Sequence, residues 1–315
     1  MSADKIPAYG VDCLKFRIMP FGSYNNSTLS IYNYDDVEYG KLEQKGNYFM
    51  LTICLPRSIR INNIIPFRFD DFDTLRETRE ESITLLENAF WDGYESKLIY
   101  AEICGTCYTV GEGKCDNLFR LVTNSMLRPK QQSQLFVSED LKKKLFPYYT
   151  GMKSWVVNDN FRVKAYDKNR QMGIKSDREL VRFEFCLTPK QIQKTLHNNT
   201  DVSSVLTQSS LEKLIGLYGE LFDILENKFI TPYRTITEDV FRRTFKENHY
   251  KPQSTYLMCK ELIVDKEQIR NIFKEADAER GHGVNSRSTI LHLKKCGLPS
   301  DTFATLEKLR SLDKT

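Results

Sequence analysis

The stretch FRVKAYDKNRQMGIKSDRELVRFEFCL, from Phe161 to Leu187, predicts a β-hairpin, because two alternating runs are joined by a polar connector that contains glycine. Successive side chains of a strand point to opposite faces, so each run separates its apolar residues from its polar ones. The apolar face collects Phe161, Val163, Ala165, Val181, Phe183, Phe185 and Leu187. The polar face collects Arg162, Lys164, Tyr166, Lys168, Arg182, Glu184 and Cys186.

The polar face of this hairpin combines a nucleophile, several cations and a carboxylate. The hydroxyl of Tyr166 is able to attack phosphorus, the lysines and arginines are able to neutralise a phosphate, and Glu184 is able to bind a metal ion. An ordinary half-exposed hairpin with cross-strand ion pairs has the same composition. The stretch alone therefore leaves two alternatives, a phosphotransfer site and a structural hairpin.

The composition is that of a folded protein that is soluble in water. The 315 residues are 40% hydrophobic and carry a formal net charge of +4, which suits one large or two small domains. The sequence has no apolar run long enough to cross a bilayer and no signal-peptide pattern at its N-terminus, so we expect a cytoplasmic location. The eight cysteines are scattered, and disulfides are not expected.

Apolar alternation predicts further strands upstream of the hairpin, and helical periodicity dominates after it. The predicted strands are 11–20, 47–55, 98–108 and 152–157, with a long loop or irregular hairpin at 21–46. The predicted helices are 72–94, 116–126, 209–228, 238–246, 266–278, 286–296 and 302–311. We therefore predict an α+β fold with a largely antiparallel sheet and flanking helices. Its catalytic domain would be residues 1–200, and a helical domain for DNA or partner binding would be residues 201–315.

A basic segment between residues 126 and 153 is interleaved with aromatic residues. Cations among rings that stack on bases suit single-stranded nucleic acid, although a solvated helix face explains the run of lysines equally well. The candidate DNA-binding residues are Lys142, Lys143, Lys144, Tyr149, Lys153, Trp155 and, from the hairpin, Lys164.

Glu102 is a carboxylate within the otherwise apolar run LIYAEICGTCY, residues 98–108. Burying a carboxylate costs free energy unless it is paired or bound to a metal ion, so a metal ligand and a structural ion pair are both consistent with it. Cys104 and Cys107 have C-x-x-C spacing. The chain offers them neither a second ligand pair nor a following helix, so zinc or thioredoxin-type chemistry is not favoured.

The order of several segments resembles that in the replication initiators of filamentous phages and related plasmids, the gene II-type nicking-joining endonucleases of rolling-circle replication. The segments are VDCLKFRIMP, LTICLPRSIRINN, IYAEICGT, FRVKAYDK, LVRFEF and LHLKKCGLPSDTF. The resemblance implies an endonuclease that nicks and rejoins single-stranded or melted origin DNA through a covalent link to the 5′ phosphate. A host helicase and a single-strand-binding protein would be its partners.

The same resemblance implies a role for each polar residue of the site. Tyr166, in AYDK, would be the nucleophile, while Lys168 and Arg182 would neutralise the phosphate. Glu102 and Glu184 would bind Mg²⁺ or Mn²⁺, the ions that a carboxylate-dominated site without histidine prefers.

One segment departs from the pattern of that family. Related proteins more often show an aspartate preceded by a basic residue, whereas this chain has Glu102 preceded by Tyr100 and Ala101. Two other functions therefore stay open. Beside the endonuclease, these alternatives are a DNA-binding initiator or regulator that lacks cleavage on the same scaffold, and a relaxase of a mobile element.

Overall fold

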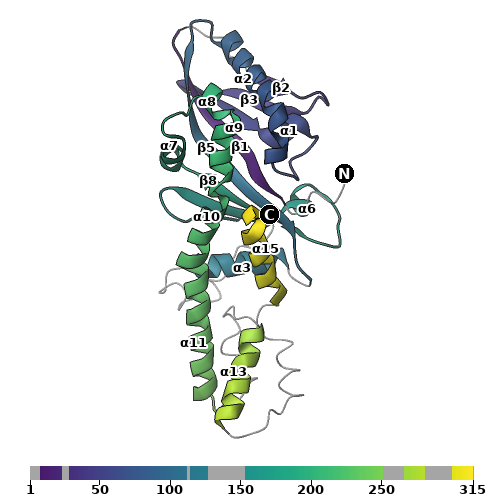
Figure 1. Ribbon diagram of the computed structural model, residues 1–315, viewed down its shortest axis with the longest axis vertical. Helices are drawn as coiled ribbons and strands as arrows, with labels where there is room; N and C mark the ends of the chain where they lie inside the picture. The colour runs from purple at the N-terminus through teal and green to yellow at the C-terminus, as the bar shows by residue number, and fades with distance from the viewer. Residues whose placement is uncertain are drawn as a thin grey trace.

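An antiparallel sheet of eight strands forms the centre of the computed structural model, in the order β2-β3-β4-β1-β5-β8-β7-β6 (Figure 1). The structure describes residues 8–22, 28–111, 114–126, 153–250, 266–280 and 300–314. The strands are β1 (Ala8–Pro20), β2 (Leu29–Tyr32), β3 (Glu38–Lys45), β4 (Tyr48–Cys54), β5 (Tyr94–Tyr108), β6 (Lys153–Val156), β7 (Phe161–Asp167) and β8 (Leu180–Leu187). The predicted α+β class is confirmed.

The hairpin predicted for residues 161–187 forms the β7–β8 pair, next to the edge strand β6. Its cross-strand partners include Lys164 with Glu184 and Tyr166 with Arg182, so the expected polar face exists. All seven apolar side chains of the hairpin lie in the main hydrophobic core. The connector is partly helical, because Asp167 caps the short helix α6 (Lys168–Gln171) by accepting hydrogen bonds from the backbone at Asn169 and Arg170.

Helices cover the apolar face of the sheet. They are α2 (Leu75–Ala89), α3 (Cys115–Met126), α7 (Pro189–Leu196), α8 (Val202–Val205), α9 (Gln208–Ile215), α10 (Leu217–Leu225) and α15 (Ser300–Arg310). Two shorter elements, α1 (Leu55–Ile59) and the 3₁₀ turn η2 (Phe69–Thr74), follow β4. Residues 21–46, predicted as a loop or an irregular hairpin, contain the β2–β3 hairpin.

A long helical arm extends from the body (Figure 1). Helix α10 continues through the π-helical turn η3 (Glu226–Ile230) into α11 (Thr231–Glu247). Pro232 lies at the start of α11, and its missing N–H accounts for the change in hydrogen-bond spacing there. The far part of α11 packs against α13 (Lys266–Glu279) through a separate apolar cluster that includes Phe241, Phe245 and Phe273.

The main core continues across residue 200. It joins side chains of the sheet to Val202, Leu211, Tyr218 and Phe222, and to Leu309 of α15. The hydroxyl of Tyr218 donates a hydrogen bond of 3.0 Å to the carbonyl of Leu309. Helix α15 and the 3₁₀ turn η4 (Ser311–Lys314) thus pack on the body, while the predicted helix at 286–296 lies outside the described residues. The division at residue 200 stays a prediction.

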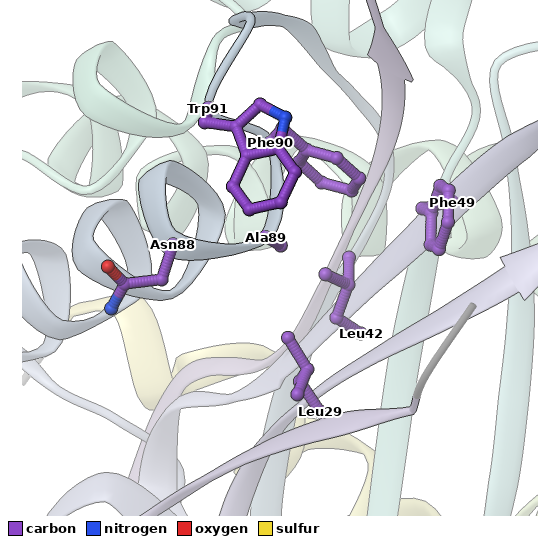
Figure 2. Close-up of a pocket in the computed structure, with 7 residues that line it drawn as sticks. All are labelled: Leu29, Leu42, Phe49, Asn88, Ala89, Phe90 and Trp91. Carbon is purple, nitrogen blue, oxygen red and sulfur yellow. The ribbon is translucent and has the colours of Figure 1, made fainter. Parts of the chain in front are cut away.

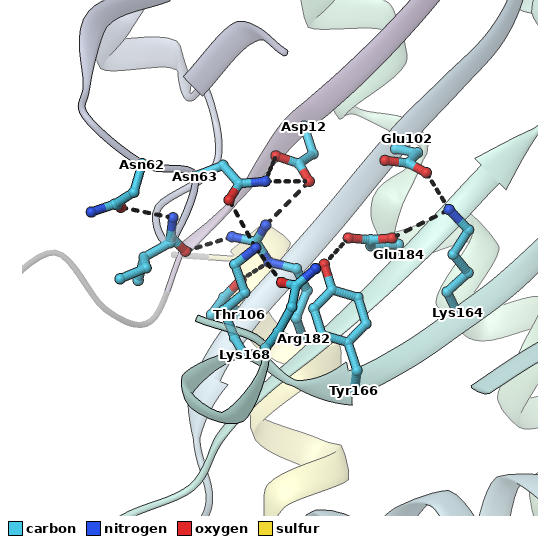
Figure 3. A network of polar contacts seen from close by, with 12 residues as sticks. Asp12, Asn62, Asn63, Glu102, Thr106, Lys164, Tyr166, Lys168, Arg182 and Glu184 are labelled. Atoms are coloured by element: carbon cyan, nitrogen blue, oxygen red, sulfur yellow. Dashed lines mark hydrogen bonds and ion pairs between the residues drawn. The ribbon is translucent and has the colours of Figure 1, made fainter. Parts of the chain in front are cut away.

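The segment before η2 is tied to β1 beyond the point where β4 ends. Val11 and Phe67 exchange two backbone hydrogen bonds of 3.0 and 2.9 Å. This bridge brings Asn63 and Ile64 over the polar face of the sheet (Figure 3). No helix among the described residues has the length and apolar character that a membrane span requires.

Gly10→Ala is expected to destabilise the protein, because a Cβ at Gly10 would lie 2.0 Å from the Phe67 carbonyl oxygen. That oxygen belongs to the backbone of the bridge, so relief requires a shift of the whole segment. We expect a loss of about 1–3 kcal/mol in unfolding free energy, the usual cost of overpacking. Urea unfolding measures it, and a variant as stable as the wild type would contradict the close packing described here.

Candidate functional site

A network of polar side chains lies on the face of the central strands opposite the helices (Figure 3). It joins residues from β1, β5, β7, β8, α6 and the segment at 62–64, which are far apart in the sequence. The labelled members are Asp12, Asn62, Asn63, Glu102, Thr106, Lys164, Tyr166, Lys168, Arg182 and Glu184. All five residues that the sequence assigned to catalysis or metal binding belong to this network.

The carboxylates of Glu102 and Glu184 lie on neighbouring strands beside the ammonium of Lys164. Lys164 donates a short hydrogen bond to Glu102, and its Nζ lies 3.8 Å from Oε2 of Glu184. Tyr100 donates a second hydrogen bond to Glu102. Glu102 therefore forms an ion pair with Lys164, as expected for a structural role. It also lies next to a second carboxylate, that of Glu184.

Tyr166 donates a short hydrogen bond to Oε1 of Glu184, so the two oxygens of this carboxylate face different partners. Burial, followed by the charge of Glu184, raises the pKa of Tyr166 well above its usual range. Burial and the neighbouring charges of Glu102 and Asp12 raise the pKa of Glu184 to about 7. Tyr166 as a whole is 5% exposed.

Arg182 is fully buried, and each of its three guanidinium nitrogens has a hydrogen-bond partner within the protein. Nε donates to Thr106 at 2.9 Å, Nη1 donates to Asp12 at 3.2 Å, and Nη2 donates to the carbonyl of Ile64. Three partners from three segments fix the orientation of this side chain. Because its side chain is 0% exposed, Arg182 is not accessible to a ligand from solvent in this arrangement.

Asp12 is a member of the network that the sequence analysis did not identify. In the β1–β5 register Val11 pairs with Ile103 and Cys13 pairs with Glu102, so Asp12 is the extra residue of a β-bulge. A bulge redirects a side chain that strict alternation would point elsewhere. The carboxylate of Asp12 therefore reaches Arg182 and the side-chain amide of Asn63. The feature of the sequence that could have identified Asp12 is its position as an aspartate inside the run VDCLKFRIMP.

Lys168 is also fully buried, and its hydrogen-bond partners among the described residues are neutral side-chain amides. Its Nζ donates to Oδ1 of Asn63 at 2.9 Å and to Oε1 of Gln171 at 2.7 Å, and it lies 5.5 Å from the ring centre of Tyr166. Burial, with the charge of Arg182 second, lowers the pKa of Lys168 to about 8. The ammonium stays close to the nucleophile candidate but is held by amide oxygens.

Stability should depend on pH through Lys168. Its folded pKa of about 8 lies below the unfolded value, so between these pH values the unfolded chain binds more protons and stability rises with pH. We expect the stability of the wild type, measured against that of Lys168→Met, to improve by on the order of 3 kcal/mol from pH 7 to pH 10.5. Urea unfolding of both proteins across that range tests it, and a constant difference would contradict the lowered pKa.

One group of donor atoms in the network suits a divalent metal ion. One atom from each of Glu102, Glu184 and Cys186 lies within 4.8 Å of the others. Two carboxylate oxygens suit Mg²⁺ or Mn²⁺, and the thiol favours the softer Mn²⁺ of the two. The ammonium of Lys164 beside both carboxylates is the group with which such an ion would compete.

A second group, Cys115, Asp167 and Glu179, has donor atoms equally close to one another. Its two carboxylates already accept hydrogen bonds from backbone N–H groups. Glu179 accepts one from Cys115, and Asp167 caps α6. Cys104 and Cys107 both lie buried in β5, and all six cysteines among the described residues are free. Cys107 packs in the apolar core, whereas Cys104 pairs across the strands with Glu184 on the polar side.

The predicted DNA-binding residues are placed only in part. Lys142, Lys143, Lys144 and Tyr149 lie outside the described residues. Lys153 and Trp155 lie in the edge strand β6, although only their backbone is described. Lys164 is described, and its partner in this structure is the Glu102 carboxylate.

The polar side of the sheet carries other basic residues outside the network. They are Lys15 and Arg17 of β1, Lys97 of β5 and Arg162 of β7, each at least partly exposed. Within the part of the chain that the structure describes, none of these four forms an ion pair. Lys15 lies 5.1 Å from the ring centre of Tyr100, whose ring also lies 5.6 Å from Nζ of Lys164.

A pocket of about 210 Å³ lies away from this network, between the β2–β4 edge and the end of α2 (Figure 2). Its lining is Leu29, Leu42, Phe49, Asn88, Ala89, Phe90 and Trp91. No ionisable side chain is among these residues, so the pocket offers shape but no acid, base or nucleophile.

No family model matches the sequence, and no curated protein sequence matches it significantly. Among solved structures, the rolling circle replication initiator protein from Geobacillus stearothermophilus aligns over 70% of this chain and 85% of that chain, with 12% identity and a TM-score of 0.31. A TM-score of this size is too low to establish a common fold.

Proposed function

We propose that the chain is a nicking-joining endonuclease that initiates rolling-circle replication, with Tyr166 as its nucleophile. The observation that supports this most is the hydrogen bond from the Tyr166 hydroxyl to Glu184, beside a second carboxylate on the same face of the sheet. A hydroxyl paired with a carboxylate base is the arrangement that activates a nucleophile. The order of the sequence segments agrees with the same function.

The proposed reaction uses the two oxygens of Glu184 differently. Oε1 accepts the phenol proton as the Tyr166 oxygen bonds to phosphorus, and the bond from phosphorus to the 3′ oxygen breaks. The 3′ end leaves as a hydroxyl after protonation by solvent, and the 5′ phosphate stays on Tyr166. The phosphotyrosine link conserves the bond energy, so a 3′ hydroxyl is able to reverse the step and rejoin the strand.

The remaining residues of the network have supporting roles in this proposal. Glu102, with Oε2 of Glu184, would hold Mg²⁺ or Mn²⁺, which when bound would neutralise charge on the phosphate. Arg182 and Lys168 were expected to contact the phosphate, but both are fully buried and hydrogen-bonded inside the protein. We therefore assign them to positioning the β7–β8 hairpin and the segment at Asn63.

The DNA strand would cross the polar side of the sheet. Lys15, Arg17, Lys97 and Arg162 are available there to phosphates, and Tyr100 offers a ring for base stacking. Residues 126–153 would help to guide the strand, and residues 201–315 would bind duplex DNA or partner proteins. Single-stranded or melted origin DNA is thus the proposed substrate.

A DNA-binding initiator that lacks cleavage is the second candidate, and the burial of Tyr166 favours it, since the residue as a whole is 5% exposed. Nicking and binding assays separate the two functions. Both use single-stranded and supercoiled DNA of the replicon that encodes the chain. With Mn²⁺ or Mg²⁺ the proposed enzyme converts supercoiled DNA to nicked circles, and EDTA prevents it. Tight binding without nicked product under the same conditions would overturn the endonuclease and leave the binding protein.

A further inference from the structure

The Lys164 ammonium occupies a position between the two carboxylates that would hold a metal ion. It donates to Glu102 and lies 3.8 Å from Oε2 of Glu184, the oxygen that faces away from Tyr166. The Glu184 side chain is 2% exposed and that of Glu102 is 11% exposed. Because little water reaches these carboxylates, a cation has to balance them, and Lys164 provides that charge in this structure.

Lys164 is also the least buried member of this cluster. Its side chain is 19% exposed, and it projects from β7 on the same face as Arg162, two residues earlier. Its flexible stem allows the ammonium to leave the carboxylates without any movement of the strand. Among the described residues, its Nζ also lies 5.6 Å from the ring centre of Tyr100, on the side of the sheet where Lys15 lies.

We propose that the Lys164 ammonium and a divalent metal ion are alternative occupants of the site between Glu102 and Glu184. Binding of the ion displaces Lys164 toward the open side of the sheet, where the ammonium becomes available to a DNA phosphate. Metal and DNA then bind cooperatively, and the coupling is reciprocal. This inference rests on the proposed function, because it assigns the metal and the DNA strand to the same site.

Manganese titration of the DNA-free protein measures the competition directly. Lys164→Met removes the internal cation and keeps an unbranched side chain only one heavy atom shorter, so its Mn²⁺ affinity should rise about ten-fold or more. Lys15→Met is the matched control, because Lys15 contacts the same Tyr100 ring but neither carboxylate in the described structure. An equal gain in Mn²⁺ affinity in both variants would mean that loss of any nearby positive charge is enough, and it would overturn the proposal. No gain in Lys164→Met would overturn it as well.

Amine labelling of the wild-type protein tests the displacement without any variant. Acetic anhydride should modify Lys164 slowly in EDTA and several-fold faster with saturating Mg²⁺, as peptide mass spectrometry reports. Lys15 serves as the internal reference, with a rate that the ion leaves nearly unchanged. A Lys164 rate that is the same in EDTA and Mg²⁺ would contradict the exchange.

Binding of a fluorescent 20-mer oligothymidylate tests the cooperativity. Mn²⁺ should tighten oligonucleotide binding by wild type and by Lys15→Met more than by Lys164→Met, in which no ammonium is released. Equal tightening in all three proteins would overturn the coupling. These measurements need no strand cleavage, so a protein that shows the exchange but forms no adduct at Tyr166 would refute the endonuclease alone.

Discussion

Tyr166→Phe should form no covalent adduct with DNA and should nick at a rate about 10⁴-fold lower than the wild type, or less. The substitution removes one oxygen, the only atom of the side chain able to bond to phosphorus. The ring remains to fill its place beside Lys168, and its hydrogen bond to Glu184 is lost. Gel assays of nicking and of protein-linked DNA measure the two effects.

Tyr100→Phe provides the matched control for this experiment. Tyr100 lies on the same side of the sheet and also donates to a carboxylate, that of Glu102. The nicking rate of Tyr100→Phe should stay within about ten-fold of that of the wild type. The Tyr100 hydroxyl orients Glu102, a proposed metal ligand, and forms no bond to phosphorus. If Tyr100→Phe abolishes the adduct and Tyr166→Phe does not, the nucleophile has been assigned to the wrong strand.

Arg182→Met should cause the largest loss of stability at the site, about 3–5 kcal/mol. It removes a fully buried guanidinium and leaves the Asp12 carboxylate with the Asn63 amide as its remaining hydrogen-bond partner among the described residues. Arg162→Met, on the neighbouring strand, is the control, since Arg162 is exposed and should cost within about 0.5 kcal/mol. Urea unfolding at pH 7 compares them.

A double variant shows whether the loss comes from the unpaired aspartate. Asp12→Asn combined with Arg182→Met removes both charges. The double variant should therefore lose less unfolding free energy than the two single variants lose in sum. If Arg182→Met fails to fold but the double variant folds, that rescue itself shows that the unpaired aspartate causes the loss. Strict additivity, or a loss below about 1 kcal/mol for Arg182→Met, would show that Arg182 is not the buried anchor described here.

The alternation of side chains was sufficient to predict the polar face of the hairpin. The sequence placed Tyr166, Arg182 and Glu184 on one face, and the β7–β8 register shows them there. It also placed Glu102 on the side of β5 that proves to face Glu184. Local periodicity is set by strand geometry and needs no knowledge of the neighbours.

The neighbours themselves depend on long-range pairing that periodicity does not contain. Asp12 joins the site because a bulge shifts its strand by one residue, and Asn63 joins because Phe67 pairs with Val11. The burial of Arg182 follows from these contacts. The local sequence around an arginine does not reveal whether its side chain is free or anchored. Only the tertiary contacts distinguish an arginine that binds phosphate from one that positions other residues.

The most direct test of the account is the identity of the residue that carries DNA after cleavage. Wild-type protein is incubated with Mn²⁺ and single-stranded DNA of its replicon, then digested with nuclease and trypsin. Mass spectrometry should find a nucleotide joined through its 5′ phosphate to Tyr166 in the peptide AYDK, residues 165–168. Nicked DNA with the nucleotide on another residue, or with none on the protein, would contradict the central claim.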